Sequence, residues 1–466
     1  MLFNSIEFII FLVLVVLVYY VIPSNKIRKV FLLLSSYYFY ANWNLAFLFI
    51  LIYETLLSYV IALKFKGNDR TKGDRWMLAL TIILLLLPLA AFKYLNFILG
   101  TLSDITALSG FTINLPEFKL MLPIGISFYT FMSIGYVIDV YKQKLSYERN
   151  ILNYSLFIGF FPQIASGPIG RAPQLLPQFK ENHPLLYENI AAGAKMMLWG
   201  FFMKLVVGDR AGIYVDTVFG NYAHHNGASL LLATFMYTIQ IYCDFAGYSL
   251  LAIGTAKTMG YDLMTNFRRP YFSTTIGDFW RRWHISLSTW FRDYLYFPLG
   301  GSRCVEWKIY RNLLIVFLVS GLWHGAAYNF LLWGLFHGVI QVLERLFKRK
   351  ADVHGVRRFF AIAVTFLLAS YGWMMFYAPN LQFIIDVTKG YFHLGVPYIH
   401  QTTIFFFLIG FLILFVKDLK DEFWPEKNYF LGSRNIFVRY ISFVILSMII
   451  VLCGVLGGGQ FIYFKF

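Results

Sequence analysis

Two histidines lie in apolar surroundings where an imidazole could carry out chemistry. His324 lies in Ser320–Gly338 (SGLWHGAAYNFLLWGLFHG), a segment without formal charge, and directly follows Trp323. Removal from water favours the uncharged ring, and an uncharged imidazole can accept a proton as a general base does. His324 is therefore the first candidate catalytic residue. The alternative is a core histidine bonded to a neighbouring helix, and His337, on another helix face, is given that structural role.

The second region, Asp278–Arg303, contains His284 among tryptophans and arginines. Its helical spacing predicts one amphipathic helix that does not cross the bilayer. The expected apolar face is Trp280, Trp283, Leu287 and Trp290, and the polar face is Arg281, Ser288 and Arg292. Guanidinium groups pair bidentately with phosphates, so Arg281 and Arg282 are candidate ligands of a phosphorylated donor, with Arg268 and Arg269 as helpers. The alternative is an interfacial helix whose arginines reach lipid headgroups.

A third polar group interrupts the apolar run Tyr237–Gly254. Asp244 is expected to be a buried carboxylate that orients a histidine, pairs with an arginine, or holds two helices in register. Lys195 and Lys204, in a preceding apolar run, are expected to extend their amines toward the headgroups. Glu54 is isolated in another apolar run and receives no role.

The predicted substrate-binding residues are Arg281, Arg282, Trp283, Asp278, Asp244 and Trp323. The sequence contains no nucleotide-binding glycine loop, metal-ligand cluster or Gly-x-Ser-x-Gly elbow, so we expect no metal and no resident cofactor.

Composition places these groups in a membrane. The 466 residues are 59% hydrophobic and 14% charged, against about 25% charged in a soluble domain. Forty basic residues oppose 24 acidic ones. They lie mostly between apolar runs, which favours cytoplasmic loops over nucleic-acid binding. Three scattered cysteines, without a CxxC pair, indicate neither zinc nor a disulfide framework.

The apolar runs predict an all-α integral membrane protein with about eleven transmembrane helices, plus re-entrant and amphipathic helices. Clear runs are Phe8–Ile22, Ala46–Leu63, Met77–Phe92, Leu120–Ile138, Ile190–Val207, Phe359–Tyr377, Thr403–Val416 and Ile441–Tyr463. Weaker runs are Val30–Tyr40, Tyr154–Ile169, Ala228–Tyr242, Leu313–Trp323 and Leu331–Leu346. The first run lacks a basic start and a cleavage site, so we interpret it as a retained span. One domain covering residues 1–466 is the simplest organisation.

Basic clusters predict the orientation of the chain. They occur at 26–29, 64–75, 142–149, 348–358 and 417–427, whereas Leu102–Pro116 and Pro379–Gln401 are poor in lysine and arginine. Because cytoplasmic loops retain Lys and Arg, this pattern predicts a multi-pass protein with its N-terminus outside the cytoplasm.

Several motifs together resemble the membrane-bound O-acyltransferase family, and best its bacterial alginate O-acetyltransferase branch. The principal ones are Asp278–Arg303, Gly321–Gly325 (GLWHG) and Trp333–Gly338 (WGLFHG). Supporting ones are Leu122–Tyr129, Phe160–Pro162, Ala165–Ile169 with Arg171, Asp244–Ser249 and Ser35–Ala41. The resemblance runs from residue 1 to about 345, with its signature core at about 120–345.

The resemblance implies that His324 is the catalytic histidine and His284 the family's second histidine. It implies a ring of helices around a thin centre pierced by a tunnel, in the inner membrane of a bacterial cell. Acetyl-CoA is the implied donor from the cytoplasm. The implied acceptor is an extracytoplasmic polysaccharide, such as alginate, cellulose or peptidoglycan. The family usually works with a periplasmic or extracellular esterase-like (SGNH) partner.

Three alternatives remain, one of which is a structural scaffold for a glycan-synthesis complex. The teichoic acid D-alanyl transfer branch shares the Arg281–His284 region, whereas Asp293–Tyr296 with Pro298–Gly301 looks more like the acetyl branch. A transporter or flippase for a cell-envelope precursor would also contain broken helices and intramembrane polar groups. The absence of an inverted repeat in the sequence argues against it.

Overall fold

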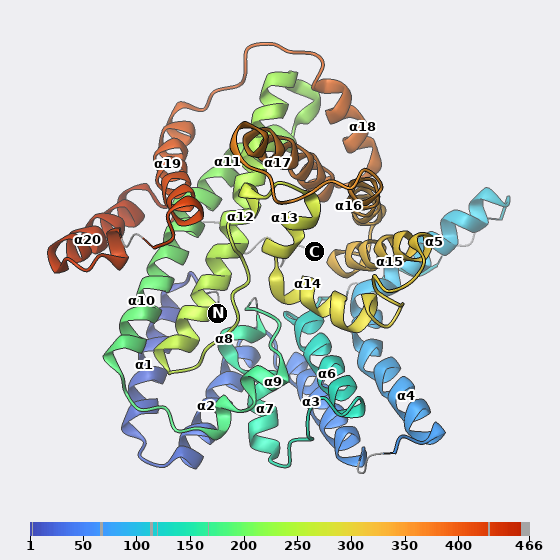
Figure 1. Ribbon diagram of the computed structural model, residues 1–466, viewed down its shortest axis with the longest axis vertical. Coiled ribbons are helices and arrows are strands. Elements are labelled where there is room, and N and C mark those ends of the chain that lie inside the picture. The colour runs from blue at the N-terminus through green and yellow to red at the C-terminus, as the bar shows by residue number, and fades with distance from the viewer. Residues whose placement is uncertain are drawn as a thin grey trace. The chain divides into compact units, whose positions relative to one another are not determined.

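The computed structural model describes residues 1, 3–65, 69–111, 115–118, 120–165, 167–426 and 429–457. Every regular element in these ranges is a helix (Figure 1). The chain forms two compact units. The N-terminal unit comprises Met1–Ala191, Thr255–Met264 and Gly325–Ala327, and the C-terminal unit comprises Ala192–Gly254, Thr265–His324 and Tyr328–Phe466.

The N-terminal unit is built around α6. Its helices are α1 (Ile6–Val21), α2 (Asn25–Ala41), α3 (Leu45–Lys64), α4 (Lys72–Leu89), α5 (Leu95–Leu108), α6 (Ile126–Tyr141), α7 (Ile151–Gly159), α8 (Phe161–Ile164) and α9 (Ala172–Leu175). Almost every residue of α6 is buried, and it packs on α3, α4 and α7. Glu54 of α3, which the sequence left isolated, is fully buried and accepts a hydrogen bond from Thr130 Oγ1 at 2.8 Å.

The C-terminal unit carries both candidate histidines. Its helices are α10 (Tyr187–Phe201, which begins in the other unit), α11 (Asp209–Phe219), α12 (Gly227–Thr258), α13 (Ile276–Arg282), α14 (Ile285–Phe291), α15 (Glu306–His324), α16 (Tyr328–Leu346), α17 (Gly355–Tyr377), α18 (Leu381–Gly390), α19 (Gln401–Phe423) and α20 (Ile436–Cys453). The π-helical turn η3 (Phe202–Gly208) joins α10 to α11.

Among the residues that the structure describes, seven helical stretches are long and apolar enough to cross a membrane. They are Leu45–Lys64, Lys72–Leu108, Tyr187–Phe219, Gly227–Thr258, Gly355–Tyr377, Gln401–Phe423 and Ile436–Cys453. Three shorter apolar helices are Ile6–Val21, Ile126–Tyr141 and Ile151–Ile164. The polytopic all-helical prediction is confirmed, whereas the number eleven stays a prediction. Residues 458–463 of the last predicted run, and Ser166 of a quoted motif, lie outside the described residues.

Two predicted boundaries are wrong for local reasons. The run Met77–Phe92 continues to Leu108, because the π-helical turn η1 (Ala90–Tyr94) follows Pro88 and lets the helix resume. Part of the predicted Leu102–Pro116 loop is therefore helix. The run Leu120–Ile138 becomes helical only at Ile126, because Gly125 has φ +73° and precedes the helix as its N-cap.

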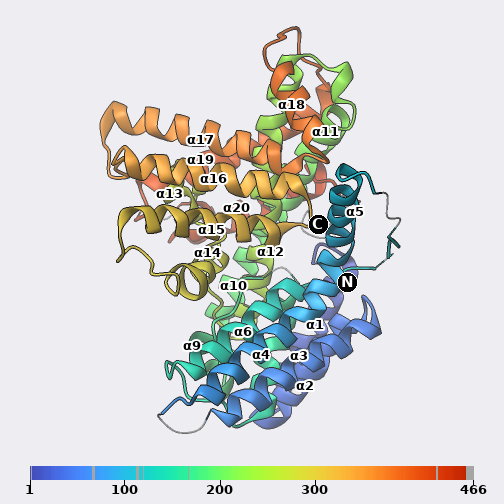
Figure 2. The ribbon, with the colours of Figure 1, turned by 90° about the vertical axis from the view of Figure 1, so that its right-hand side faces the viewer.

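Glycines set the close packing of α15 on α16, whose long axes run side by side (Figure 2). A Cβ added to Gly321 would lie 2.2 Å from the Phe330 carbonyl oxygen, and one added to Gly334 would lie 2.3 Å from the Phe317 carbonyl oxygen. Both contact atoms belong to the backbone, so either could move away only if its helix moved. The glycines therefore fix the distance between the helix that ends at His324 and its neighbour.

Gly334→Ala is expected to destabilise the protein by about 1–3 kcal/mol, because the added methyl group forces α15 and α16 apart. Thermal unfolding of the detergent-solubilised protein measures this. Gly100→Ala in α5 is the control, because nothing lies within 4 Å of its added Cβ. Equal melting temperatures for the two variants would contradict the packing argument.

Candidate active site

His324 is the last residue of α15 and is only 3% exposed. Three aromatic rings contact it edge to face. The ring centroids of Trp323, Trp333 and Phe376 lie 4.8, 5.0 and 5.2 Å from that of His324. α16 supplies Trp333 and α17 supplies Phe376. The sequence prediction of an apolar setting for this imidazole is confirmed on the sides that the C-terminal unit supplies.

The predicted single amphipathic helix around His284 is wrong. α13 ends at Arg282 and α14 begins at Ile285, while His284 between them adopts a left-handed backbone with φ 43° and ψ 55°. Such a conformation costs a non-glycine residue roughly 1–2 kcal/mol. Trp280, Trp283, Leu287 and Trp290 are nevertheless all buried, as the apolar stripe predicted.

Asn266 provides the physical reason for the break. Its backbone carbonyl accepts from Ile285 N at 2.9 Å, and Arg268 N donates to the Arg282 carbonyl at 2.9 Å. The side-chain oxygen of Asn266 accepts from Ser286 N at 3.3 Å and from Ser286 Oγ at 2.9 Å. These bonds replace those that a continuous helix would make. We call the paired segments 266–269 and 282–286 the His284 hairpin.

The same oxygen orients the imidazole of His284. Asn266 Oδ1 lies 3.1 Å from His284 Nδ1. The backbone N–H of Ser286 donates to the same atom, which identifies it as the amide oxygen. Because an amide oxygen only accepts hydrogen bonds, Nδ1 must carry the proton and donate it. Nε2 is then the acceptor nitrogen of the ring. Asn266 was missed from the sequence, where an asparagine 18 residues before the histidine gives no periodic signal.

Trp323 connects the two histidines. Its ring centroid lies 5.9 Å from His284 and 4.8 Å from His324. Trp283, within the hairpin, is fully buried, and its ring centroid lies 4.5 Å from that of Trp373. The structure thus brings His324, His284 and Trp323 together, whereas the ring of Trp283 packs on Phe279 and Trp373. His337, given a structural role, accepts a hydrogen bond from Trp280 Nε1 at 3.4 Å and links α16 to α13.

Burial lowers the pKa of His284 from 6.5 to about 3. The unfolded chain, with a His pKa of about 6.5, therefore binds a proton that the folded protein excludes between these values. Stability is lost as the pH falls through this window. We expect the melting temperature to drop between about pH 7 and pH 4, and His284→Gln to flatten that drop. Parallel pH dependence of the two proteins would contradict a buried neutral imidazole.

The four predicted arginines line one cavity of about 600 Å³. Arg292 joins them, and the acidic residues in its wall are Asp278 and Glu422. Arg282 is held by Asp278, with Nε 3.0 Å from Oδ2, and by Glu422, with Nη1 3.0 Å from Oε2. The excess of positive charge suits an anionic ligand. Glu422 was also missed, because it follows Arg282 by 140 residues.

Asp244 lies in a separate buried cluster. It forms an ion pair with Lys204, whose Nζ also lies 2.8 Å from Asp209 Oδ1. Lys204 is 1% exposed, so the expectation that it reaches toward the headgroups is wrong. It lies in the π-helical turn η3 and pairs with Asp244 of α12, which supports the helix-register interpretation of Asp244.

Comparisons with known proteins indicate the family to which the chain belongs. The model of the membrane-bound O-acyltransferase family matches residues 31–388, a longer stretch than the predicted signature core. The probable alginate O-acetylase AlgI of Pseudomonas aeruginosa is 37% identical over 399 residues, covering 85% of this chain and 75% of that protein. The peptidoglycan O-acetyltransferase of Helicobacter pylori is 34% identical over 395 residues, covering 78% and 73%.

A more distant relative is the teichoic acid D-alanyltransferase of Bacillus subtilis. It is 31% identical over 252 residues, covering 50% of this chain and 62% of that protein. The matched stretch and the relatives show that the chain is an O-acyltransferase and belongs to the membrane-bound O-acyltransferase family.

Proposed function

We propose that this chain moves an acetyl group from acetyl-CoA toward a hydroxyl group of an extracytoplasmic polysaccharide, with His324 as the catalytic base. The observation that carries the proposal is the contact of one indole, Trp323, with both His324 and His284. Arg282, two residues before His284, lies in the wall of the arginine cavity. The proposed reacting centre and the candidate phosphate site are therefore connected by a short segment.

The chemistry balances without a metal or an oxidant. His324 takes the proton of the acceptor hydroxyl as its oxygen attacks the thioester carbonyl carbon. The carbon–sulfur bond then breaks, and the leaving thiolate recovers the proton from the imidazolium. His284, with Nε2 as acceptor, positions the donor. The arginine cavity holds the donor phosphates.

The acetyl group is favoured over D-alanine by the relatives. The alginate and peptidoglycan O-acetyltransferases align over 78% and more of this chain in the matches described, against 50% for the Bacillus subtilis D-alanyltransferase. The acceptor is an exopolysaccharide such as alginate or cellulose, or peptidoglycan. We place the protein in a bacterial inner membrane, N-terminus outside, as one functional domain with about eleven spans. A tunnel admits the donor, and an extracytoplasmic esterase-like partner completes the transfer.

Purified protein in proteoliposomes tests the donor. We expect acetyl-CoA to release free CoA thiol when an acceptor polysaccharide or partner is supplied on the opposite face. D-alanyl carrier protein is the competing donor. Thiol release from the carrier protein but not from acetyl-CoA would replace the proposal with D-alanyl transfer.

A further inference from the structure

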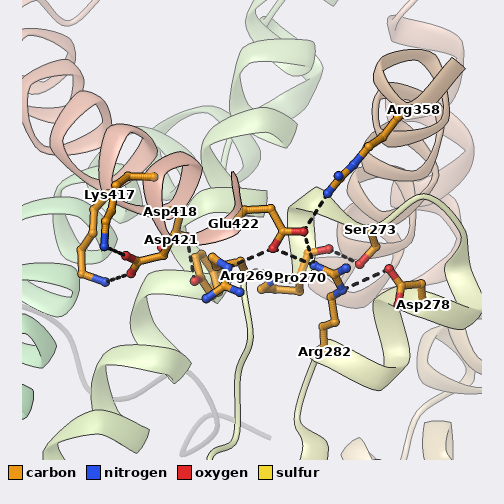
Figure 3. Close-up of polar contacts among 12 residues, drawn as sticks. Arg269, Pro270, Ser273, Asp278, Arg282, Arg358, Lys417, Asp418, Asp421 and Glu422 are labelled. Atoms are coloured by element: carbon orange, nitrogen blue, oxygen red, sulfur yellow. Dashed lines mark hydrogen bonds and ion pairs between the residues drawn. The ribbon is translucent and has the colours of Figure 1, made fainter. Parts of the chain in front are cut away.

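Glu422 of α19 is a buried carboxylate surrounded by three arginines (Figure 3). Its side chain is 6% exposed. Oε2 accepts from Arg269 Nε, Oε1 accepts from Arg358 Nη2, and Arg282 Nη1 donates to both oxygens, all at 3.0 Å. Each oxygen thus accepts two charge-assisted hydrogen bonds, the strong kind. α19 lies beyond residues 31–388 that match the family.

Two of these arginines belong to the two sides of the His284 hairpin. Arg269 ends one side and has a left-handed backbone with φ 44°. Arg282 ends α13 on the other side, two residues before His284. One carboxylate therefore ties both sides together at the point where two residues adopt a costly backbone conformation.

The remaining arginines of the cavity are differently placed. Arg281 is 65% exposed and has only Asp278 at 3.5 Å as an ion-pair partner in the described chain. The Arg268 guanidinium makes no side-chain hydrogen bond or ion pair among the described residues, although Arg268 lines the cavity. Arg282, by contrast, is held by two carboxylates. From the sequence, Arg281 and Arg282 are equal candidates for binding phosphate, but their surroundings in the structure differ.

We propose that Glu422 is a positioning residue that clamps Arg269 and Arg282 to hold the His284 hairpin, leaving Arg268 and Arg281 to bind the donor phosphates. This inference rests on the proposed use of acetyl-CoA. It gives α19 a role in the reaction, and it divides the cavity into structural and ligand-binding arginines.

The test separates kcat from KM for acetyl-CoA in the purified full chain. Glu422→Gln is expected to lower kcat about ten-fold or more, because the hairpin loosens. It is also expected to lower KM about three-fold, because a negative charge leaves the cavity. Arg268→Gln and Arg281→Gln are expected to raise KM about ten-fold each, with kcat within about two-fold.

Controls make the outcome decisive. Asp421→Asn changes the adjacent carboxylate, which pairs with Lys417 and Lys420, and should leave kcat and KM within about two-fold. The double variant Arg282→Gln with Glu422→Gln should have a kcat no lower than that of Glu422→Gln alone, because the two substitutions remove the same ion pair. Equilibrium binding of CoA to each solubilised variant reports on the arginines without turnover.

Two results would overturn the inference while the wild-type enzyme uses acetyl-CoA. One is a Glu422→Gln enzyme with unchanged kcat. The other is an Arg282→Gln enzyme whose only defect is a raised KM. Failure of the wild type to bind CoA or release thiol would instead reject the donor assignment itself.

Discussion

Replacing His324 with alanine or glutamine is expected to lower kcat about 10²–10⁴-fold, because general-base catalysis contributes that much. Trp323, Trp333 and Phe376 already surround the ring, so water is poorly placed to substitute for the missing base. Turnover of acetyl-CoA by purified enzyme measures the loss, with protein abundance in the membrane fraction measured alongside.

His337→Gln is the matched control for His324→Gln. His337 is also fully buried among aromatic rings, but it lies on α16 and accepts a hydrogen bond from Trp280. Its replacement should lower the stability of the folded protein, and it should lower kcat far less than His324→Gln does. Normal polymer acetylation by the His324 variants, at wild-type abundance, would remove His324 from the mechanism.

Asn266→Ala is expected to lower kcat about 10²-fold, because the acceptor that orients His284 and its hairpin disappears. Its side-chain oxygen accepts from Ser286 N and Oγ and from His284 Nδ1, so its loss removes three hydrogen bonds that hold the hairpin and the imidazole. Single-turnover transfer from labelled acetyl-CoA measures the defect separately from product release.

Asn266→Asp distinguishes orientation from charge. Aspartate keeps the acceptor oxygen but places a carboxylate beside His284, which raises the pKa of that imidazole. If the neutral ring is required, activity should fall as the pH drops through the raised pKa, while the wild-type enzyme, whose His284 has a pKa of about 3, stays flat over that range. Identical pH profiles for the two enzymes would contradict a role for neutral His284.

The features predictable from the sequence are those that local pattern determines. An uncharged apolar stretch around His324 predicts a buried imidazole, because burial there follows from the residues on either side. The stripe Trp280, Trp283, Leu287 and Trp290 likewise predicts which side chains are buried. The two arginine pairs predict a candidate phosphate site, but their shared cavity depends on the pairing of segments 266–269 and 282–286, which only the structure shows.

The features that the sequence could not predict depend on tertiary contacts. Helical spacing continues through His284, and only the bonds from Asn266 show that the helix breaks there. In the sequence Glu422 is one of four acidic residues among the lysines of 417–427, and only the fold brings it against Arg269, Arg282 and Arg358. From the sequence, Lys204 is expected to extend toward the lipid headgroups, whereas the fold buries it in ion pairs with Asp209 and Asp244.

A structure of the enzyme bound to an unreactive thioether analogue of acetyl-CoA tests the central claim most directly. We predict that the analogue's phosphates contact Arg268 and Arg281, and that its acetyl carbonyl carbon lies within about 4 Å of the His324 ring, as a near-attack geometry requires. An analogue bound elsewhere, or a His324 ring closed off from it by packed side chains, would contradict the account.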